Sequence, residues 1–336
     1  MRQTAFTTPD GRPVDVLTIA AGAYQAKILA LGASIADLTA PVAGQPRSVV
    51  LGLANLSDYV EQGRHMGAVA GRCANRIADG KFQLDGKAYQ LPLNERGVTH
   101  LHGGMMGFGR RVWTVEAVSG ASVTLSILSP DGDEGYPGTV RARCSYAIDA
   151  SGTLTINLSA ATDAPTLVNL ATHSYFNLAG SDTILDHRLT IAADRYTPVN
   201  ARLIPTGESL PVEQSGYDFR KASGIGEQLA KTPNGFDHNY VVAMTPSRDP
   251  RFMARLAAPS GELAMEVWST EPGLQFYDGQ HLPDTDAFRG RRGAKHAGCC
   301  LEPQRFPDGI NQPGFPSVVL RPGEMYRQVT EYRFKT

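Results

Sequence analysis

The sequence predicts an all-β fold, a large antiparallel sandwich with few and short helices. Apolar residues alternate with polar ones in stretches such as 123–127, 154–158 and 263–267. Residues two apart share one face of a strand, so this period indicates strands that are buried on one side. Two-residue turn sequences separate several of these stretches, and helical patterns are rare. Together these observations favour sheets that cover one another.

The turn sequences indicate how neighbouring strands are joined. They are Asp85-Gly86 between "KFQL" and "KAYQL", Ser151-Gly152 before "TLTINLSA", and Ser260-Gly261 before "ELAMEVW". Such short links join antiparallel neighbours, whereas parallel strands need a long crossover. The sheets are therefore expected to be mostly antiparallel.

Two helical patterns are visible, "NLSDYVEQ" behind a possible Asn55 cap and "GIGEQLAK" after Ser223. Neither is long enough to cover a sheet, so the strands have to be buried by packing sheet on sheet. The chain has no internal repeat and no Pro/Ser-rich linker. We therefore predict one domain over residues 1–336.

The composition indicates which partners the protein can bind and in which cell compartment it is expected. The 336 residues are 42% hydrophobic and 19% charged, with a net charge of -1, which gives no general attraction to nucleic acid or anionic membrane. No run of about 18 apolar residues occurs, and the N-terminal sequence does not resemble a signal peptide. The four cysteines show no CxxC spacing, which indicates reduced thiols. We expect a cytoplasmic protein that binds neither nucleic acid nor membrane.

The stretch "VNLATHSYFNLAGS", Val168 to Ser181, is unusually polar for a strand. If it forms one unbroken strand, Asn169, His173, Tyr175 and Asn177 lie on a single face. That face could meet solvent, or it could bind a hydroxyl-rich ligand.

Signatures of common cofactors are missing. The sequence contains no GxGxxG after a strand, no GxxxxGK phosphate loop and no GxSxG elbow. His100 and His102 have the spacing of metal ligands on a strand, but no nearby His or Cys completes a set. We predict a protein without a cofactor or a bound metal.

Five polar clusters remain as candidates for chemistry. They contain Asn75 and Arg76 in "GRCANRI", His102 in "HLHGG", His173, Asp237 in "GFDHNY", and Glu302 in "CCLEPQRFPD". Each residue taken alone could be structural. Glu302 is the exception, because a carboxylate after an apolar triplet in a buried strand would be costly without a function. The remaining histidines at 65, 187, 281 and 296 are interpreted as solvated.

A histidine and a glutamate without metal or cofactor can serve as general acid and general base. The opening and closing of a cyclic hemiacetal needs only two such proton transfers. Sugar mutarotation is therefore the reaction that fits the candidate residues.

The sequence also resembles the aldose 1-epimerases, or galactose mutarotases. "GRCANRI", "LHGG", "THSYFNLAG", "GFDHNY", "PGLQFYDG" and "LEPQRFPD" occur in that family's order, and the similarity covers nearly the full length. It implies a single-domain β-supersandwich whose groove binds a free hexose such as D-galactose or D-glucose.

The resemblance also implies roles for individual residues. Glu302 would remove the proton from the anomeric hydroxyl, and His173 would protonate the ring oxygen, a step in which His102 could share. The remaining residues would hold the sugar, and they are Asn75, Arg76, His102, Asp237 and Gln275. Arg305 departs from the pattern, because many relatives have histidine there.

Three other readings stay open at this stage. A glycoside hydrolase usually needs two carboxylates flanking the bond, whereas the matched pair here is one Glu and one His. A hexose-6-phosphate 1-epimerase would need basic residues around the phosphate, where this sequence has Asp237. A sugar sensor or lectin would use the same groove without catalysis. The resemblance does not rank galactose against glucose, xylose or arabinose.

Overall fold

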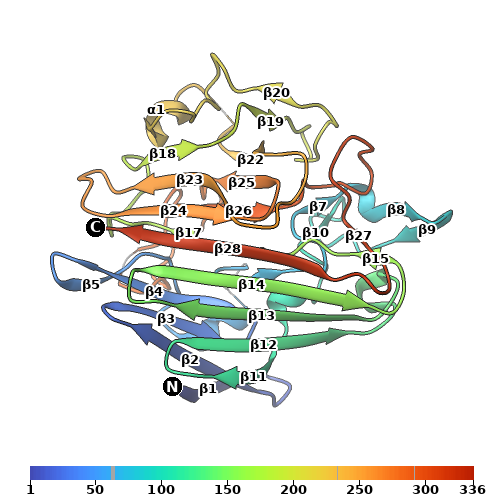
Figure 1. Ribbon diagram of the computed structural model, residues 1–336, viewed down its shortest axis with the longest axis horizontal. Coiled ribbons are helices and arrows are strands. Elements are labelled where there is room, and N and C mark those ends of the chain that lie inside the picture. Colours follow the sequence, from blue (N-terminus) through green and yellow to red (C-terminus); the bar gives the residue numbers. More distant parts are fainter. Residues whose placement is uncertain (62–64, 233, 291) are drawn as a thin grey trace.

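The computed structural model describes residues 1–61, 65–232, 234–290 and 292–336, and β-strands dominate it (Figure 1). Every pair of named strands in these ranges is antiparallel. The structure thus confirms the predicted all-β antiparallel sandwich.

A nine-stranded sheet runs through the molecule. Figure 1 shows most of its strands stacked from bottom to top. In spatial order the strands are β11 (Thr114–Val118), β12 (Ser122–Ser129), β13 (Val140–Ile148), β14 (Thr153–Thr162), β28 (Tyr326–Lys335), β24 (Ala264–Ser269), β23 (Arg251–Ala257), β18 (Arg188–Ile191) and β21 (Ser223–Gly224). The long strand β28 pairs with β14 on one side and with β24 on the other.

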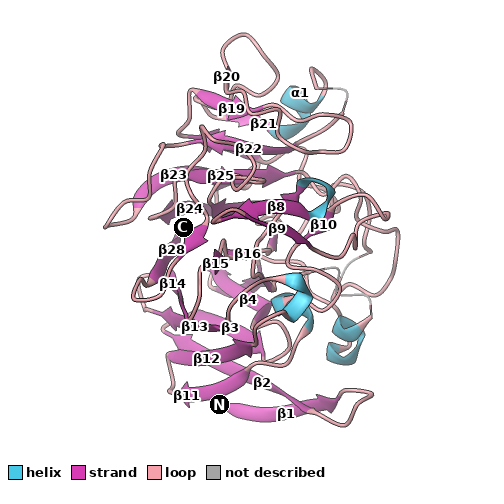
Figure 2. Cartoon of the chain, turned by 90° about the vertical axis from the view of Figure 1, so that its right-hand side faces the viewer, coloured by secondary structure: helices cyan, strands magenta, loops and turns pink. Residues whose placement is uncertain are grey.

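Two further sheets pack against this one. The first contains β1 (Arg2–Thr7), β2 (Pro13–Ala21), β3 (Tyr24–Leu29), β4 (Ser34–Val42) and β5 (Gln45–Ser48). The second contains β17 (Tyr175–Phe176), β26 (Cys299–Gln304), β25 (Gly273–Tyr277), β22 (Asp237–Val241), β19 (Arg195–Thr197) and β20 (Leu210–Pro211). In Figure 2 the first lies beside β11–β13 and the second beside β23.

Short elements complete the chain. The two-stranded pairs are β6 (Val69–Ala70) with β16 (Ala171–Thr172), β7 (Arg76–Ile77) with β10 (His100–Leu101), β8 (Lys81–Leu84) with β9 (Lys87–Gln90), and β15 (Thr166–Leu167) with β27 (Val319–Leu320). The helices are α1 (Ile225–Leu229) and the 3₁₀ turns η1 (Leu56–Val60), η2 (Ala78–Gly80), η3 (Phe108–Arg110) and η4 (Asp133–Gly135). None of the helices in the described ranges is long and apolar enough to cross a membrane.

The alternating stretches form the core as predicted. Leu154, Ile156 and Leu158 of β14 are buried, while Asn157 between them is exposed. Asp85 and Gly86 both have positive φ, as a type I′ hairpin between β8 and β9 requires. Both helical patterns form short helices, η1 and α1. The last residue of the first pattern, Gln62, lies outside the described residues.

The stretch from Val168 to Ser181 is not one unbroken strand. From Thr166 onward the chain changes partner every few residues, since β15 pairs with β27, β16 with β6, and β17 with β26. Asn169 and Asn177 are buried and donate side-chain hydrogen bonds to backbone carbonyls, including those of Arg305 and Ala297. The predicted polar face is therefore mostly a set of structural links between segments.

Candidate active site

A cavity of about 270 Å³ gathers residues that lie far apart in the sequence. Six of the seven predicted site residues line it, namely Asn75, Arg76, His102, His173, Asp237 and Glu302. The seventh, Gln275, is buried directly behind Asp237. A cavity of this size is at the small end of ligand sites and is suited to a ligand of monosaccharide size.

Three neighbouring strands of the second packed sheet supply one wall. Gln275 of β25 lies opposite Glu302 of β26, and Asp237 of β22 lies opposite Tyr277 of β25. Cys300 and Glu302 are two residues apart on β26 and therefore share a face of that strand. His173, in the short link between β16 and β17, faces the same side.

Tight backbone turns place Asn75 and His102. Both residues have positive φ, 61° and 49°, and the main-chain N–H of His102 donates to the carbonyl of Asn75. Gly103 follows with φ of 85°, and a Cβ there would lie 1.7 Å from the carbonyl oxygen of Gly71. Only glycine allows this approach, so Gly103 is needed for close contact between the two backbone segments.

Glu302 and His173 form a buried pair of titratable groups. They are only 2% and 7% exposed, and Nε2 of His173 lies 3.9 Å from Oε1 of Glu302. Burial raises the pKa of Glu302 well above its usual value, nearby Asp237 raises it further, and Arg76 opposes the rise. Burial lowers the pKa of His173 to about 4. Both shifts favour the uncharged forms.

His102 presents a fixed tautomer to the cavity. Its Nδ1 accepts a hydrogen bond from the main-chain N–H of Asn75 at 3.2 Å, which leaves the proton on Nε2. Burial lowers the pKa of His102 well below 6.5, so the ring is neutral at physiological pH. His102 can therefore donate one hydrogen bond to a ligand.

His100 belongs to the scaffold and forms no ligand pair with His102. Its Nδ1 donates to the carbonyl of Pro92 at 2.8 Å, and its Nε2 accepts from the Tyr136 hydroxyl at 2.7 Å. Both ring nitrogens are thus engaged within the protein, and the spacing of the two histidines reflects a structural role for the first.

A chain of polar contacts holds Arg76 and Asp237. Arg76 donates to both carboxylate oxygens of Glu95 at 2.8 Å and to Asp237 at 3.2 Å. The amide of Gln275 donates to the other oxygen of Asp237 at 2.6 Å, and Gln304 donates to Gln275 at 3.3 Å. Burial alone would raise the pKa of Glu95, but the contacts with Arg76, Thr99 and Arg96 together lower that pKa. The guanidinium is thereby oriented before a ligand arrives.

Sequence reasoning missed Glu95, which lies in "LNERGVTHLHGG" beside a predicted cluster but far from Arg76 in sequence. It also missed the aromatic lining from Tyr175 and Tyr277, whose ring centroids are 6.1 Å apart. The motifs around both tyrosines were recognised, yet no residue pattern distinguished a ring in the cavity from one in the core.

The interpretation of four histidines as solvated is wrong for three of them. His187 and His296 are buried and bond to main-chain groups of Leu178 and Asp278. His65 lines the active-site cavity, with its ring centroid 4.7 Å from that of His102, and burial lowers its pKa to about 3. His281 is exposed at the rim of the cavity.

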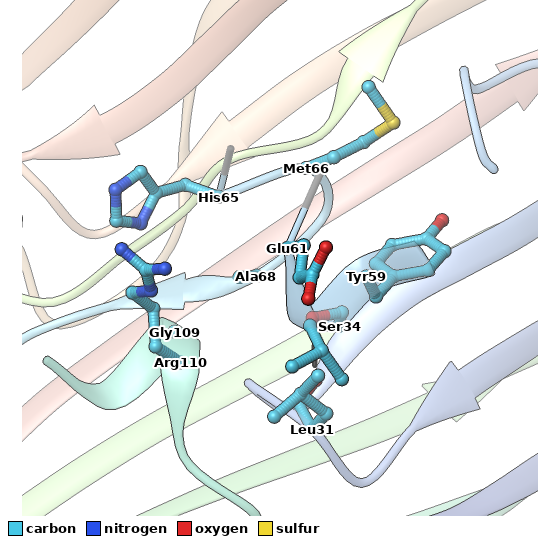
Figure 3. Close-up of a pocket in the computed structure, with 10 residues that line it drawn as sticks. Leu31, Ser34, Tyr59, Glu61, His65, Met66, Ala68, Gly109 and Arg110 are labelled. Carbon is cyan, nitrogen blue, oxygen red and sulfur yellow. Dashed lines mark hydrogen bonds between the residues drawn. The ribbon is translucent and has the colours of Figure 1, made fainter. Parts of the chain in front are cut away.

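His65 also borders a second cavity of about 200 Å³ (Figure 3). Figure 3 shows the imidazole of His65 beside the guanidinium of Arg110 at one end, with Tyr59 and Glu61 at the other. His65 therefore separates this cavity from the active-site cavity.

Comparison with known proteins identifies the family of the chain. The sequence profile of the family described as aldose 1-epimerase matches residues 15–333. The galactose mutarotase of Homo sapiens is 46% identical over 297 residues, which is 87% of this chain and 85% of that protein. The aldose 1-epimerase of Escherichia coli is 33% identical and covers 99% of both chains.

Solved structures show the same architecture. The aldose epimerase homologue from C. elegans superposes with a TM-score of 0.88 at 29% identity, over 95% of this chain and 98% of that one. The galactose 1-epimerase from Lactobacillus acidophilus superposes with a TM-score of 0.86 at 25% identity, over 100% of this chain and 98% of that one.

The chain has the β-sandwich fold of the aldose epimerase structures, with a cavity of monosaccharide size. The chain belongs to the aldose 1-epimerase family. It is an enzyme of carbohydrate metabolism that interconverts the α and β anomers of aldoses. The hydrolase, sugar-phosphate and sensor readings are not favoured.

Proposed function

We propose that Glu302 is the general base and His173 the general acid for anomer interconversion of free D-galactose and D-glucose. The observation that carries this proposal is the facing pair of Glu302 and His173, buried in the wall of a monosaccharide-sized cavity. Their separation of 3.9 Å is too long for a hydrogen bond, so each group remains available to the sugar.

The reaction transfers two protons in opposite senses. The Glu302 carboxylate takes the proton of the anomeric hydroxyl, the bond between C1 and the ring oxygen breaks, and the His173 imidazolium gives its proton to that oxygen. The open-chain aldehyde then rotates about its C1–C2 bond. Neutral His173 takes the proton back from the C5 hydroxyl as protonated Glu302 returns its proton to the aldehyde oxygen, and the ring closes on the other face.

The buried environment suits this cycle. The pair carries one proton to share, which lies on His173 before ring opening and on Glu302 after it. In water the usual pKa values favour the proton on histidine. Burial raises the pKa of Glu302 and lowers that of His173, so the open-chain state with two uncharged groups is stabilised relative to the ion pair. Ring opening is thereby assisted.

The surrounding polar groups would hold the sugar in register. Arg76 and Asp237 are fixed by Glu95 and Gln275 and present oriented donors and acceptors to hydroxyl groups. Asn75 and the Nε2–H of His102 are available from the opposite loops. The carboxylates of Glu95 and Asp237 would repel a sugar phosphate, which supports a neutral substrate.

The decisive experiment follows the optical rotation of freshly dissolved α anomers of galactose, glucose, xylose and arabinose with and without enzyme. We expect accelerated equilibration of galactose and glucose. Glu302→Gln should abolish the acceleration while galactose still binds in calorimetry. A variant that equilibrates α-D-galactose at the wild-type rate would show that Glu302 is not the base.

We further propose a single domain over residues 1–336 and a cytoplasmic location. The unpaired and buried state of the four cysteines supports a reducing compartment. Limited proteolysis would test the domain proposal, since one domain should yield no stable fragments, and cell fractionation would test the location.

A further inference from the structure

Cys300 lies beside the proposed acid and base, yet the proton transfers do not use it. Its Sγ is 3.4 Å from Nδ1 of His173, and the thiol is fully buried. Together His173, Cys300 and Glu302 offer three ligand atoms that all lie within 4.8 Å of one another. A thiol, an imidazole and a carboxylate form a donor set typical of zinc and related soft cations.

The spacing suits a tetrahedral ion. Bond lengths of about 2.3 Å to sulfur and about 2.0 Å to nitrogen place two such ligands about 3.5 Å apart. The observed distance from Sγ to Nδ1 matches this value. Glu302 lies on the same face of β26 as Cys300. A rotation of its side chain within the cavity therefore brings the carboxylate to the same ion.

The cavity provides both access and an open ligand position. His173 and Glu302 line the cavity, so an ion can reach these two residues from the sugar-binding side. The thiol of Cys300, which lies behind them, then replaces a water ligand of the ion. Three protein ligands leave a fourth position that faces the cavity and can hold water. An ion in this position is bound by the Glu302 carboxylate, which is the group proposed to take the proton of the anomeric hydroxyl.

We propose that His173, Cys300 and Glu302 form a site for a thiophilic divalent cation, zinc or cadmium, whose binding excludes the sugar and inhibits the enzyme. The Cys300 thiol and the His173–Glu302 pair each release one proton to solvent as the metal binds, and the thiolate, neutral His173 and ionised Glu302 each contribute a lone pair. No electron transfer is involved. The inhibitory part rests on the roles proposed for His173 and Glu302, whereas the binding part does not.

The test uses the full-length protein and cadmium chloride, because a cadmium–thiolate bond gives an ultraviolet charge-transfer band that needs no catalysis. We expect one band that saturates at one equivalent of cadmium, and inhibition that a chelator reverses. Cys300→Ser should lose the band, and its inhibition constant, taken relative to its own metal-free rate, should rise at least tenfold. Cys299→Ser is the matched control, since Cys299 lies on the same strand with its side chain on the opposite face.

Two further measurements keep the proposal open to refutation if Cys300→Ser fails to fold. Saturating galactose should weaken cadmium binding to the wild-type protein, and Glu302→Gln should weaken it through loss of a ligand. A wild-type protein without the band, a band that persists in Cys300→Ser, or cadmium affinity that galactose leaves unchanged would each overturn the proposal. If Glu302→Gln kept full activity but bound cadmium weakly, the catalytic assignment would fail while the metal site stood.

Discussion

Nε2 of His173 faces Oε1 of Glu302 across 3.9 Å, with no hydrogen bond between them. A direct bond would fix the shared proton between the two side chains. The gap instead lets a bound sugar connect them through its anomeric hydroxyl and its ring oxygen. The first three predictions follow from this arrangement.

Replacing Glu302 with glutamine should lower kcat by about 10³-fold, within the range typical of general base catalysis. Galactose affinity should stay within about tenfold of the wild type, because the carboxylate acts mainly in the transition state. Polarimetry and calorimetry measure the two effects separately. Glu208→Gln is a suitable control, since Glu208 is exposed on a loop and should retain full activity.

His173 and His102 should respond differently to replacement. His173→Asn removes the proposed acid and should reduce kcat by roughly 10²-fold or more. His102→Asn removes only one hydrogen bond from Nε2 to the sugar, so it should raise KM about tenfold with a smaller change in kcat. Steady-state polarimetry over a range of galactose concentrations separates the two. Unchanged activity in His173→Asn would move the acid role to His102.

The pH dependence of kcat/KM should lack an inflection near 6.5. An ordinary histidine acid would lose its proton there, and the rate would fall as pH rises. Here burial lowers the pKa of His173 to about 4 and raises that of Glu302, so His173 does not lose a proton near pH 6.5. The rate should therefore show no histidine step near pH 6.5 and should fall below about pH 4, where His173 gains a proton while Glu302 is already protonated. Circular dichroism at each pH would exclude unfolding, and an inflection near 6.5 would contradict this account.

Sugar binding should depend on the forked shape of the Arg76 guanidinium and not only on its charge. Arg76→Lys keeps the positive charge but cannot bond both oxygens of Glu95 and one of Asp237 at once. We expect KM for galactose to rise about tenfold or more. Glu95→Gln should give a smaller rise, because it weakens the orientation of Arg76 without removing the guanidinium. Equal KM values for Arg76→Lys and the wild type would show that charge alone suffices.

The neighbouring Arg72 should matter for stability. Its guanidinium is buried and donates to the carbonyls of Ser129, Pro130, Pro137 and Gly138. Arg72→Leu leaves these acceptors without their donor and should lower the free energy of unfolding by about 3–5 kcal/mol. Urea unfolding measures the change.

Arg143→Leu provides the comparison for Arg72. Arg143 is exposed, and among the described residues its side chain pairs with Glu116 alone, so its loss should change the free energy of unfolding by less than about 0.5 kcal/mol. Similar destabilisation by both variants would mean that the carbonyl contacts of Arg72 contribute little.

The strands with clear alternation could be predicted from the sequence because a single local rule determines them. The burial of Leu154, Ile156 and Leu158 follows from an apolar residue at every second position. The hairpin at Asp85-Gly86 follows from the residue types of its turn. The segment around His173 could not be predicted in this way. Its pairing partners come from three distant parts of the chain, and no local pattern shows where one partner gives way to the next.

The same distinction applies to the site. Glu302 could be recognised because a charged residue follows an apolar run. His65 and Glu95 could not, because only the folding of distant segments brings them to the active-site cavity. His65 is 37 residues from His102 in sequence, yet their rings lie 4.7 Å apart. The catalytic roles came from the family resemblance, since the residues alone indicated only an acid and a base.

The position of β28 in the large sheet has a consequence for biosynthesis. The strands from β11 to β14 and those from β18 to β24 precede β28 in the chain, and hydrogen bonding between the two groups runs through it. Until β28 leaves the ribosome, β14 and β24 each present an unpaired edge, which is a site for aggregation. Nascent chains that stall before β28 should therefore depend on chaperones that shield exposed strand edges.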